Sequence, residues 1–479
     1  MVEISASPFR PPLTEAFEQA LAYLNRLPSA PVAPTADLAA VRARLSHPLC
    51  DEGIPAEQVI AELARDVEAG LVGCAGGRFF AWVIGGALPA ALAADWLTAA
   101  WDQNASLYAT GPAAAVAEEV AGAWLKEIFG LPAAASFAFV TGCQMAHVTC
   151  LAAARHRLLA RRGWDVEQRG LAGAPPISIF TSCERHGTVE RAVRLLGVGK
   201  QHLIDLPSDS HGRLERQTLE RALTTHGDGP AIVLLQAGDL KFGAYDPFES
   251  LIPLAHKYGA WVHIDGAFGL WAAASPRYRH LLRGVEHADS WATDGHKWLN
   301  VPYDSGYAFV ADAEAHRASM SHRASYLTHA EEARDQMDWN PESSRRARGF
   351  TTYAALRELG RNGIADLVDR SCLHAHALVT QIGSLPGAEV LAQPIINQGL
   401  VRFLDTRPGA TDADHDRRTN EVIDAICAGG VAFFGGVTWR GRRAMRVSVC
   451  NWLTTDDDVV RVVRAVQAIL ARRSPDAPG

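Results

Sequence analysis

The sequence predicts an α/β protein with a mostly parallel sheet, a helical N-terminal segment and a smaller C-terminal α+β domain. Two observations predict this class. Between about residues 79 and 359, short β-rich runs alternate with helical stretches, the pattern of a parallel sheet covered by helices. The chain also has 479 residues, 48% of them hydrophobic, which is more than one core usually supports, so several structural units are expected.

The N-terminal segment, residues 1–75, is predicted to be helical and to lack a core of its own. One helix carries Phe17, Leu21 and Leu24 on one face. A second helix carries an apolar stripe of Val59, Ile60, Leu63 and Val67. These stripes need another surface to cover them, which is either the main domain or a partner subunit.

The large domain is predicted over residues 76–365. The expected buried strands are Ile177–Thr181, Ala231–Gln236, Ala260–Ile264 and Tyr307–Val310. The expected helices include Ala113–Phe129 and Pro247–Lys257. Ligands of such sheets bind beyond the carboxyl ends of the strands, where the connecting loops converge.

The small C-terminal domain is predicted over residues 366–479. Its expected strands are Leu400–Leu404, Val431–Phe434 and Arg446–Val449. A closing helix is expected after Thr454 and Thr455, because acidic residues at its start and an apolar stripe follow.

Composition excludes several classes of function. The net charge is −7 with no basic block, so we expect no nucleic-acid partner, and no long apolar run predicts a membrane span. Residues 1–12 carry no apolar signal core, so a cytoplasmic protein is expected. The eight cysteines are scattered without a CxxC pair, so we expect neither a metal site nor a disulfide framework.

The first candidate site residue is Lys297, in the segment SWATDGHKWLNVP. A surface lysine after a turn is the alternative interpretation. However, Trp298 and Leu299 follow it, and an enclosed lysine loses hydration, which lowers its pKa. A neutral lysine amine can form a Schiff base with a carbonyl cofactor.

Asp265 ends a predicted buried strand in the segment AWVHIDGAFGL. A turn aspartate is the alternative interpretation. In enzymes that use pyridoxal phosphate (PLP), a carboxylate at such a place pairs with the pyridine nitrogen. Gly266 and Ala267 are small enough to leave room for a flat ring.

Two helix starts complete the candidate site. His186 follows a strand and opens a helix, where an imidazole can cap the helix or lie flat on a cofactor ring. A second strand runs into Gly142, and a helix begins near Cys143 and Gln144. The free N–H groups of that helix start suit a phosphate, although many α/β proteins have such a turn.

Taken together, these segments resemble the group II PLP-dependent decarboxylases, which include aromatic-L-amino-acid, glutamate and diaminobutyrate decarboxylases. The resemblance extends from about Arg78 to Val466. Three motifs occur in family order and spacing: H-x-x-V-E-R-A from His186, HIDGA from His263 and HKWL from His296.

The resemblance implies the fold-type I PLP-dependent transferase fold, with a mostly parallel seven-stranded sheet in the large domain. It also implies an obligate homodimer with a shared active site, in which the N-terminal helices wrap the other subunit. Its implied reaction is decarboxylation of an L-amino acid to an amine and CO2.

The resemblance also implies residue roles. Lys297 would form the Schiff base, Asp265 would pair with the ring nitrogen, and His186 and Ala267 would pack on opposite faces of the ring. The phosphate contacts implied by position come from Gly142, Cys143, Gln144 and His296.

Two departures from the family pattern affect these expectations. Asp294 stands where the family usually has asparagine. A carboxylate near a phosphate is repelled unless it points away or bonds to backbone donors, and we expect this one to face away from the phosphate. Gln336 stands where aromatic decarboxylases carry the tyrosine that protonates Cα. Relatives that replace this tyrosine can divert the reaction to an aldehyde by oxidative deamination. His322, Tyr326 and His329 are alternative proton donors.

The substrate pocket is predicted to include Trp82 and Gln336, with Asn104 and Ser106 coming from the partner subunit. The three arginines Arg345, Arg346 and Arg348 either bind carboxylates or form a salt-bridged face. Besides the two enzyme reactions, a non-catalytic PLP-binding homologue remains open. A nucleotide-binding protein has no support, because neither GxGxxG nor GxxxxGK[ST] is present.

Overall fold

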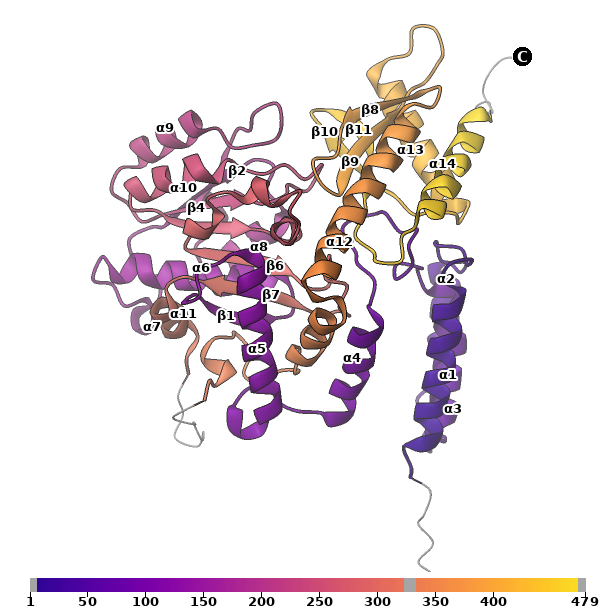
Figure 1. The fold of residues 1–479 in the computed structure, drawn as a ribbon, viewed down its shortest axis with the longest axis horizontal. Coiled ribbons are helices and arrows are strands. Elements are labelled where there is room, and N and C mark those ends of the chain that lie inside the picture. Colours follow the sequence, from indigo (N-terminus) through magenta and orange to yellow (C-terminus); the bar gives the residue numbers. More distant parts are fainter. Residues whose placement is uncertain (1–6, 323–332, 473–479) are drawn as a thin grey trace, which may run out of the picture.

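A computed structural model of the chain describes residues 7–322 and 333–472. Figure 1 shows a large α/β body, a smaller sheet beside it and a group of N-terminal helices at one side. The α/β prediction is confirmed, with one seven-stranded and one four-stranded sheet. The large sheet contains β1 (Ser136–Val140), β2 (Ser178–Ser182), β3 (Leu203–Leu206), β4 (Ala231–Gln236), β5 (Trp261–Asp265), β6 (Ser290–Asp294) and β7 (Gly306–Val310). The small sheet contains β8 (Ala388–Ala392), β9 (Gln398–Phe403), β10 (Gly435–Trp439) and β11 (Arg442–Ser448).

The helices lie around these sheets (Figure 1). Those before and within the large sheet are α1 (Arg10–Arg26), α2 (Leu38–Leu45), α3 (Ala56–Val67), α4 (Pro89–Trp101), α5 (Pro112–Phe129), α6 (Cys143–Ala160), α7 (Val166–Arg169), α8 (Gly187–Leu195), α9 (Arg216–His226), α10 (Phe248–Lys257) and α11 (Ala313–Met320). The later ones are α12 (Gly349–Gly383), α13 (Asp412–Ala428) and α14 (Asp456–Ala471). None of the described helices is long and apolar enough to cross a membrane.

The large sheet has the strand order β1-β7-β6-β5-β4-β2-β3. Only β7 runs antiparallel to its neighbours, so the prediction of a mostly parallel sheet is confirmed. Side chains alternate between its faces: Val233 and Leu235 of β4 pack in the core with α5 and α10, whereas Ile232 and Leu234 pack with α6 and α8. Both faces are covered by helices, which leaves the strand ends free to carry a site.

The prediction of a strand at Val431–Phe434 is wrong. The β-strand of this region is β10, which forms a tight hairpin with β11 because Arg440 and Gly441 both adopt positive φ. That turn pairs Trp439 with Arg442 and thereby fixes the register. Phe433 instead crosses to the large domain, where its ring stacks on Phe79 at 5.1 Å.

The predicted closing helix is confirmed as α14. The Thr455 hydroxyl accepts from the Asp458 N–H, and the Asp458 carboxylate accepts from the Thr455 N–H, which completes a capping box. The helix α12 runs through residue 365, with a kink at Gly360, so it belongs in part to both sides of the predicted domain boundary. The division at residues 75 and 365 stays a prediction.

The N-terminal helices α1 and α3 pack on each other and extend away from both sheets (Figure 1). Their apolar stripes are only partly covered, because Phe17 of α1 is 49% exposed and Leu63 of α3 is 50% exposed. This segment therefore has no closed core of its own, as its sequence predicts.

Candidate active site

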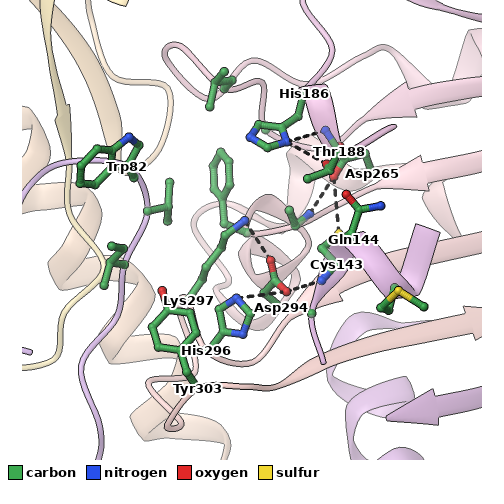
Figure 2. Close-up of a pocket in the computed structure, with 18 of the residues that line it drawn as sticks. Trp82, Cys143, Gln144, His186, Thr188, Asp265, Asp294, His296, Lys297 and Tyr303 are labelled. Carbon is green, nitrogen blue, oxygen red and sulfur yellow. Dashed lines mark hydrogen bonds and ion pairs between the residues drawn. The ribbon is translucent and has the colours of Figure 1, made fainter. Parts of the chain in front are cut away.

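A cavity of about 420 Å³ opens beyond the carboxyl ends of β4, β5 and β6 (Figure 2). Its position is the one expected for ligands of a parallel sheet. The predicted site residues that line it are Trp82, Gly142, Cys143, Gln144, His186, Asp265, Ala267, His296 and Lys297. These residues are far apart in the sequence, so the fold brings nine of the twelve predicted site residues to one place.

Lys297 lies just after β6 and is followed by Trp298 and Leu299, which are both buried. Its ammonium group pairs with the Asp294 carboxylate at 2.9 Å, as the dashed line in Figure 2 marks. Burial alone lowers the pKa of Lys297, but this pairing outweighs it, so that the pKa is raised above its usual range. The expectation of a lowered pKa is therefore wrong, because it ignored the carboxylate three residues away.

The expectation that Asp294 faces away from the phosphate-binding turn is also wrong. Its Oδ1 accepts a hydrogen bond from the Cys143 N–H at 2.5 Å, at the start of α6. The same oxygen lies 3.4 Å from His296 Nε2. The attraction of the helix N-terminus and of Lys297 for a negative charge explains this orientation. Asp294 therefore occupies donors that a phosphate would use.

The turn into α6 has the features of an anion cradle. Gly142 comes close to His296, because a Cβ added to Gly142 would lie 3.0 Å from His296 Cε1. The side-chain amide of Gln144 is buried, and neither its nitrogen nor its oxygen has a partner among the described residues. Buried polar atoms without a hydrogen-bond partner, beside the start of a helix, fit a bound phosphate group.

Asp265 ends β5 with 6% of its surface exposed. Its Oδ1 accepts a hydrogen bond from the Ala267 N–H at 3.2 Å, and its Oδ2 lies 3.5 Å from His147 Nε2. Although burial opposes ionisation, His147 holds the pKa of Asp265 below its usual range. A buried anion that faces the cavity is suited to a cationic partner such as a protonated ring nitrogen.

His186 serves as the N-cap of α8, where its Nδ1 accepts from the Thr188 N–H at 3.2 Å. The same ring also lines the cavity, so His186 both caps the helix and lies where a ligand would bind.

His296 accepts a hydrogen bond from the Ser305 N–H, and its ring stacks on Tyr303 with 4.3 Å between centroids. Tyr303 was not predicted as a site residue.

Three predicted pocket residues do not line this cavity. The side chain of Asn104 accepts from the Arg345 N–H, and Ser106 is buried with its carbonyl bonded to Met337. Gln336 is only 1% exposed and accepts from Arg334. The prediction of Gln336 in the pocket is not supported within one subunit, because its short 3-10 turn packs against the interior of the chain. Tyr326 and His329 lie outside the described residues.

Sequence reasoning missed two kinds of residue. Arg446 of β11 lines the cavity and donates to the Leu240 carbonyl at 2.9 Å, and burial lowers its pKa to about 10. His147 and His263 lie behind Asp265. The available signals were a charged residue in a strand of buried residues, and the alternation of Trp261, His263 and Asp265 along β5.

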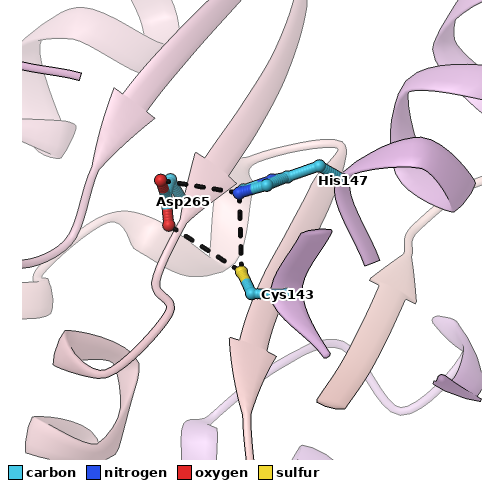
Figure 3. Close-up of side chains that lie close together, drawn as sticks. All are labelled: Cys143, His147 and Asp265. Carbon is cyan, nitrogen blue, oxygen red and sulfur yellow. Dashed lines mark hydrogen bonds and ion pairs between the residues drawn. The ribbon is translucent and has the colours of Figure 1, made fainter. Parts of the chain in front are cut away.

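The buried trio Cys143, His147 and Asp265 has the donor types of a metal site (Figure 3). One donor atom from each lies within 4.8 Å of the other two, but these atoms already contact one another, with His147 Nε2 3.5 Å from both Cys143 Sγ and Asp265 Oδ2. Burial raises the pKa of the Cys143 thiol well above its usual value, so a cation would first have to displace a proton. A cation here would also take the carboxylate that faces the cavity.

Comparison with known proteins agrees with the geometry. A family model described as the pyridoxal-dependent decarboxylase conserved domain matches residues 41–404. The aromatic-L-amino-acid decarboxylase of Bacillus atrophaeus is 24% identical over 484 residues, which cover 100% of this chain and 98% of that protein. The L-2,4-diaminobutyrate decarboxylase of Rhizobium meliloti is 28% identical over 384 residues, which cover 78% of this chain and 74% of that protein.

Solved structures share the fold. A tryptophan decarboxylase (TDC) from Oryza sativa, solved with PLP and tryptamine, superposes with a TM-score of 0.91 at 23% identity, over 98% of this chain and 100% of that one. The 4-hydroxyphenylacetaldehyde synthase of Rhodiola rosea superposes with a TM-score of 0.86 at 20% identity, over 97% of this chain and 98% of that one. The predicted fold-type I architecture is thus confirmed.

Proposed function

We propose that this chain, which belongs to the pyridoxal-dependent decarboxylase family, converts an L-amino acid to the corresponding amine and CO2. Its cofactor is PLP, and its class is that of the PLP-dependent carboxy-lyases. The observation that carries the proposal is the convergence of Lys297, Asp265 and His186 on one cavity beside an anion cradle.

The residues of the cavity fit the cofactor from end to end. Lys297 would hold its aldehyde carbon covalently, and the ionised Asp265 would hold a proton on the ring nitrogen. His186 and Ala267 would flank the ring. Gly142, Cys143, Gln144 and His296 would surround the phosphate, where the orphaned Gln144 amide offers a hydrogen-bond donor. When bound, PLP supplies a conjugated ring that accepts the electron pair left by departing CO2.

Asp294 controls the proton on Lys297 in this proposal. The 2.9 Å pairing keeps the lysine amine charged while the site is empty. An incoming phosphate would compete with Asp294 for the Cys143 N–H, because both are anions at the same helix start. Lys297 also has the position and the length to carry protons within the cavity.

A homodimer with a shared active site is part of the proposal. The exposed apolar side chains of α1 and α3, Phe17 and Leu63 among them, support a partner subunit that covers them. Asn104 and Ser106, which do not line the cavity of their own chain, would line that of the partner. Residence in the cytoplasm stays a prediction.

Decarboxylation with oxidative deamination is the second candidate function. Two observations favour it: Gln336 replaces the expected tyrosine, and the fold is shared with an aldehyde synthase. In this route CO2 is again lost, but O2 is consumed and the product is an aldehyde, with ammonia and hydrogen peroxide.

Product analysis tests the proposal. The PLP-loaded protein is incubated with a panel of L-amino acids under air and under argon, and CO2, amine, aldehyde and peroxide are measured. Amine and CO2 in equal amounts under both gases are expected. Aldehyde with peroxide, formed only under air, would establish the second function. PLP binding without turnover of any amino acid would leave a non-catalytic homologue as the remaining interpretation.

A further inference from the structure

A continuous chain of polar side chains runs behind Asp265, away from the cavity. His147 Nε2 lies 3.5 Å from Asp265 Oδ2, and His147 Nδ1 lies 2.9 Å from His263 Nε2. His263 Nδ1 lies 2.9 Å from Ser290 Oγ, which accepts from the Trp261 indole N–H at 2.9 Å. We call these five residues the Asp265 relay. Figure 3 shows its first step, with the imidazole of His147 pointing at Asp265.

The secondary structure explains why these residues meet. Trp261, His263 and Asp265 are alternate residues of β5, so all three project to the face of the sheet that α6 covers. Ser290 is paired with His263 on the neighbouring strand β6. His147 lies one turn after Cys143 on α6 and faces the same strands.

The relay is fully enclosed. His147, His263 and Ser290 each have 0% exposed surface. Burial and the neighbouring His147 together lower the pKa of His263 to about 3, so His263 is neutral near pH 7. A neutral imidazole has one N–H donor and one acceptor nitrogen, so each ring nitrogen has a defined role.

The relay is connected from Asp265 to Trp261 by hydrogen-bonding contacts. An ionised Asp265 can only accept, so His147 presents Nε2–H to it. His147 Nδ1 and His263 Nε2 share one hydrogen bond at 2.9 Å, and His263 Nδ1 and the Ser290 hydroxyl share a second one at 2.9 Å. The Trp261 indole can only donate, and it donates to Ser290. At the cavity end, Asp265 also accepts from the Ala267 N–H at 3.2 Å, and Cys143 Sγ lies 3.5 Å from His147 Nε2.

We infer that His147 is a positioning residue for the cofactor, because its Nε2, 3.5 Å from Asp265 Oδ2, holds the carboxylate facing the cavity, while His263 and Ser290 hold the His147 ring in place. The inference rests on the proposed function, in which Asp265 holds the proton of the PLP ring nitrogen. It assigns a role to buried residues that have no contact with the cavity.

The test compares three variants of His147 in the full-length protein. In His147→Gln, the amide nitrogen can reach the place of Nε2 and still donate to Asp265. In His147→Asn, the amide reaches only the place of Nδ1 and loses Asp265, which makes it the matched control. His147→Leu removes both contacts. The dissociation constant of PLP is measured for each by absorption titration, with circular dichroism as a check on folding.

The expected result is a loss of PLP affinity by about 10- to 100-fold in His147→Leu and His147→Asn, the usual effect of losing a hydrogen bond to a charged group. His147→Gln should recover most of the affinity. The 1-deaza analogue of PLP, in which carbon replaces the ring nitrogen, should bind the four proteins with equal affinity, because it offers Asp265 no proton.

Equal PLP affinity in all three variants would overturn the inference, and so would a parallel loss of affinity for the deaza analogue. Failure of the wild-type protein to bind PLP would instead refute the proposed function, so the two failures are distinguishable. Should the His147 variants not fold, Ser290→Ala provides a second test, because it removes the hydroxyl that orients His263. It should weaken PLP binding and leave binding of the analogue unchanged.

Discussion

Two buried polar regions of this molecule use similar residues in different ways. One is the cavity floor, made of Lys297, Asp294 and the Asp265 relay. The other is a cluster around Glu118, made of Arg334, Arg345, Arg348 and Gln336, which we call the arginine cluster. Both lie beside the seven-stranded sheet and both contain charges almost removed from water.

The difference is what the charges face. In the arginine cluster, Arg345 pairs with Glu118 at 2.8 Å with neither side chain exposed, and it donates to the carbonyls of Ala105 and Phe139. Arg348 pairs with Asp304. On the cavity floor, by contrast, Lys297 and Asp265 face an open volume of about 420 Å³. Buried charge by itself therefore does not identify a binding site. A buried charge that faces an open cavity does identify one.

The arginines at 345, 346 and 348 illustrate this distinction. Their sequence allowed either a carboxylate-binding role or a salt-bridged face. The structure pairs each with a carboxylate of the same chain, namely Glu118, Asp95 and Asp304. The salt-bridged interpretation is confirmed for these three residues.

The largest expected effect is on the cavity floor. Lys297→Ala should reduce decarboxylation by at least the factor of about 10²–10⁴ that a positioned proton carrier contributes, and should abolish covalent PLP binding. Turnover and the visible absorption of the cofactor check this result, with the exposed Lys257→Ala as control. Turnover within tenfold of the wild-type value would contradict the role of Lys297.

The arginine cluster should respond in stability and not in cofactor binding. Glu118→Gln leaves Arg345 buried without its carboxylate, so the free energy of unfolding should fall by about 3–5 kcal/mol. Urea unfolding measures this change. The exposed pair of Glu127 with Arg361 provides the matched control, because Glu127→Gln should change stability by about 1 kcal/mol or less. A change in PLP affinity without a change in the free energy of unfolding would show that Glu118 serves cofactor binding and not stability.

Asp294→Asn tests the role of charge on the cavity floor, because it removes the carboxylate charge and keeps the shape of the side chain. Without the carboxylate the pKa of Lys297 falls, so more of the amine is neutral at pH 8. The rate of PLP incorporation at pH 8 should rise by about tenfold for each unit by which that pKa falls. Rapid-mixing absorption measures the rate, and Asp95→Asn serves as control. A slower rate would contradict this role of Asp294.

An effect that depends on pH is expected for His316, which lies beside the arginine cluster. Its ring bonds to Ser136 Oγ at 2.7 Å and to the Trp339 carbonyl at 2.9 Å, and burial lowers its pKa to about 3. Since the unfolded chain takes up this proton near pH 6.5, the stability that His316 provides is complete above that pH. It is lost as pH falls toward 3, by up to about 1.4 kcal/mol per pH unit.

His316→Gln keeps a polar side chain that does not titrate. We expect the variant to be less stable than the wild type at pH 7 and to approach it as pH falls to 4, as measured by urea unfolding at several pH values. A constant difference in unfolding free energy across this range would show that His316 does not titrate with unfolding.

Much of the fold follows from local sequence. The strand β4 was predicted with its exact bounds, and the other predicted strands of the large sheet agree within one residue, because short apolar runs bounded by turn residues favour buried strands. Cofactor chemistry was equally local, since Lys297, Asp265 and His186 lie in short motifs in a fixed order. These residues indeed share one cavity.

The tertiary structure decided which residues from distant segments contact one another. From the sequence we predicted that Asp294 faces away from a phosphate and that the pKa of Lys297 is lowered. In the folded chain Asp294 lies between Lys297 and the start of α6 and contacts both. The prediction from sequence also placed Gln336 in the pocket and overlooked His147. Charge pairing depends on distances across the fold, which no local pattern of residues specifies. The sequence by itself therefore determined the predicted strands of the large sheet, the order of the motifs and the cofactor, and only packing decided which charges meet.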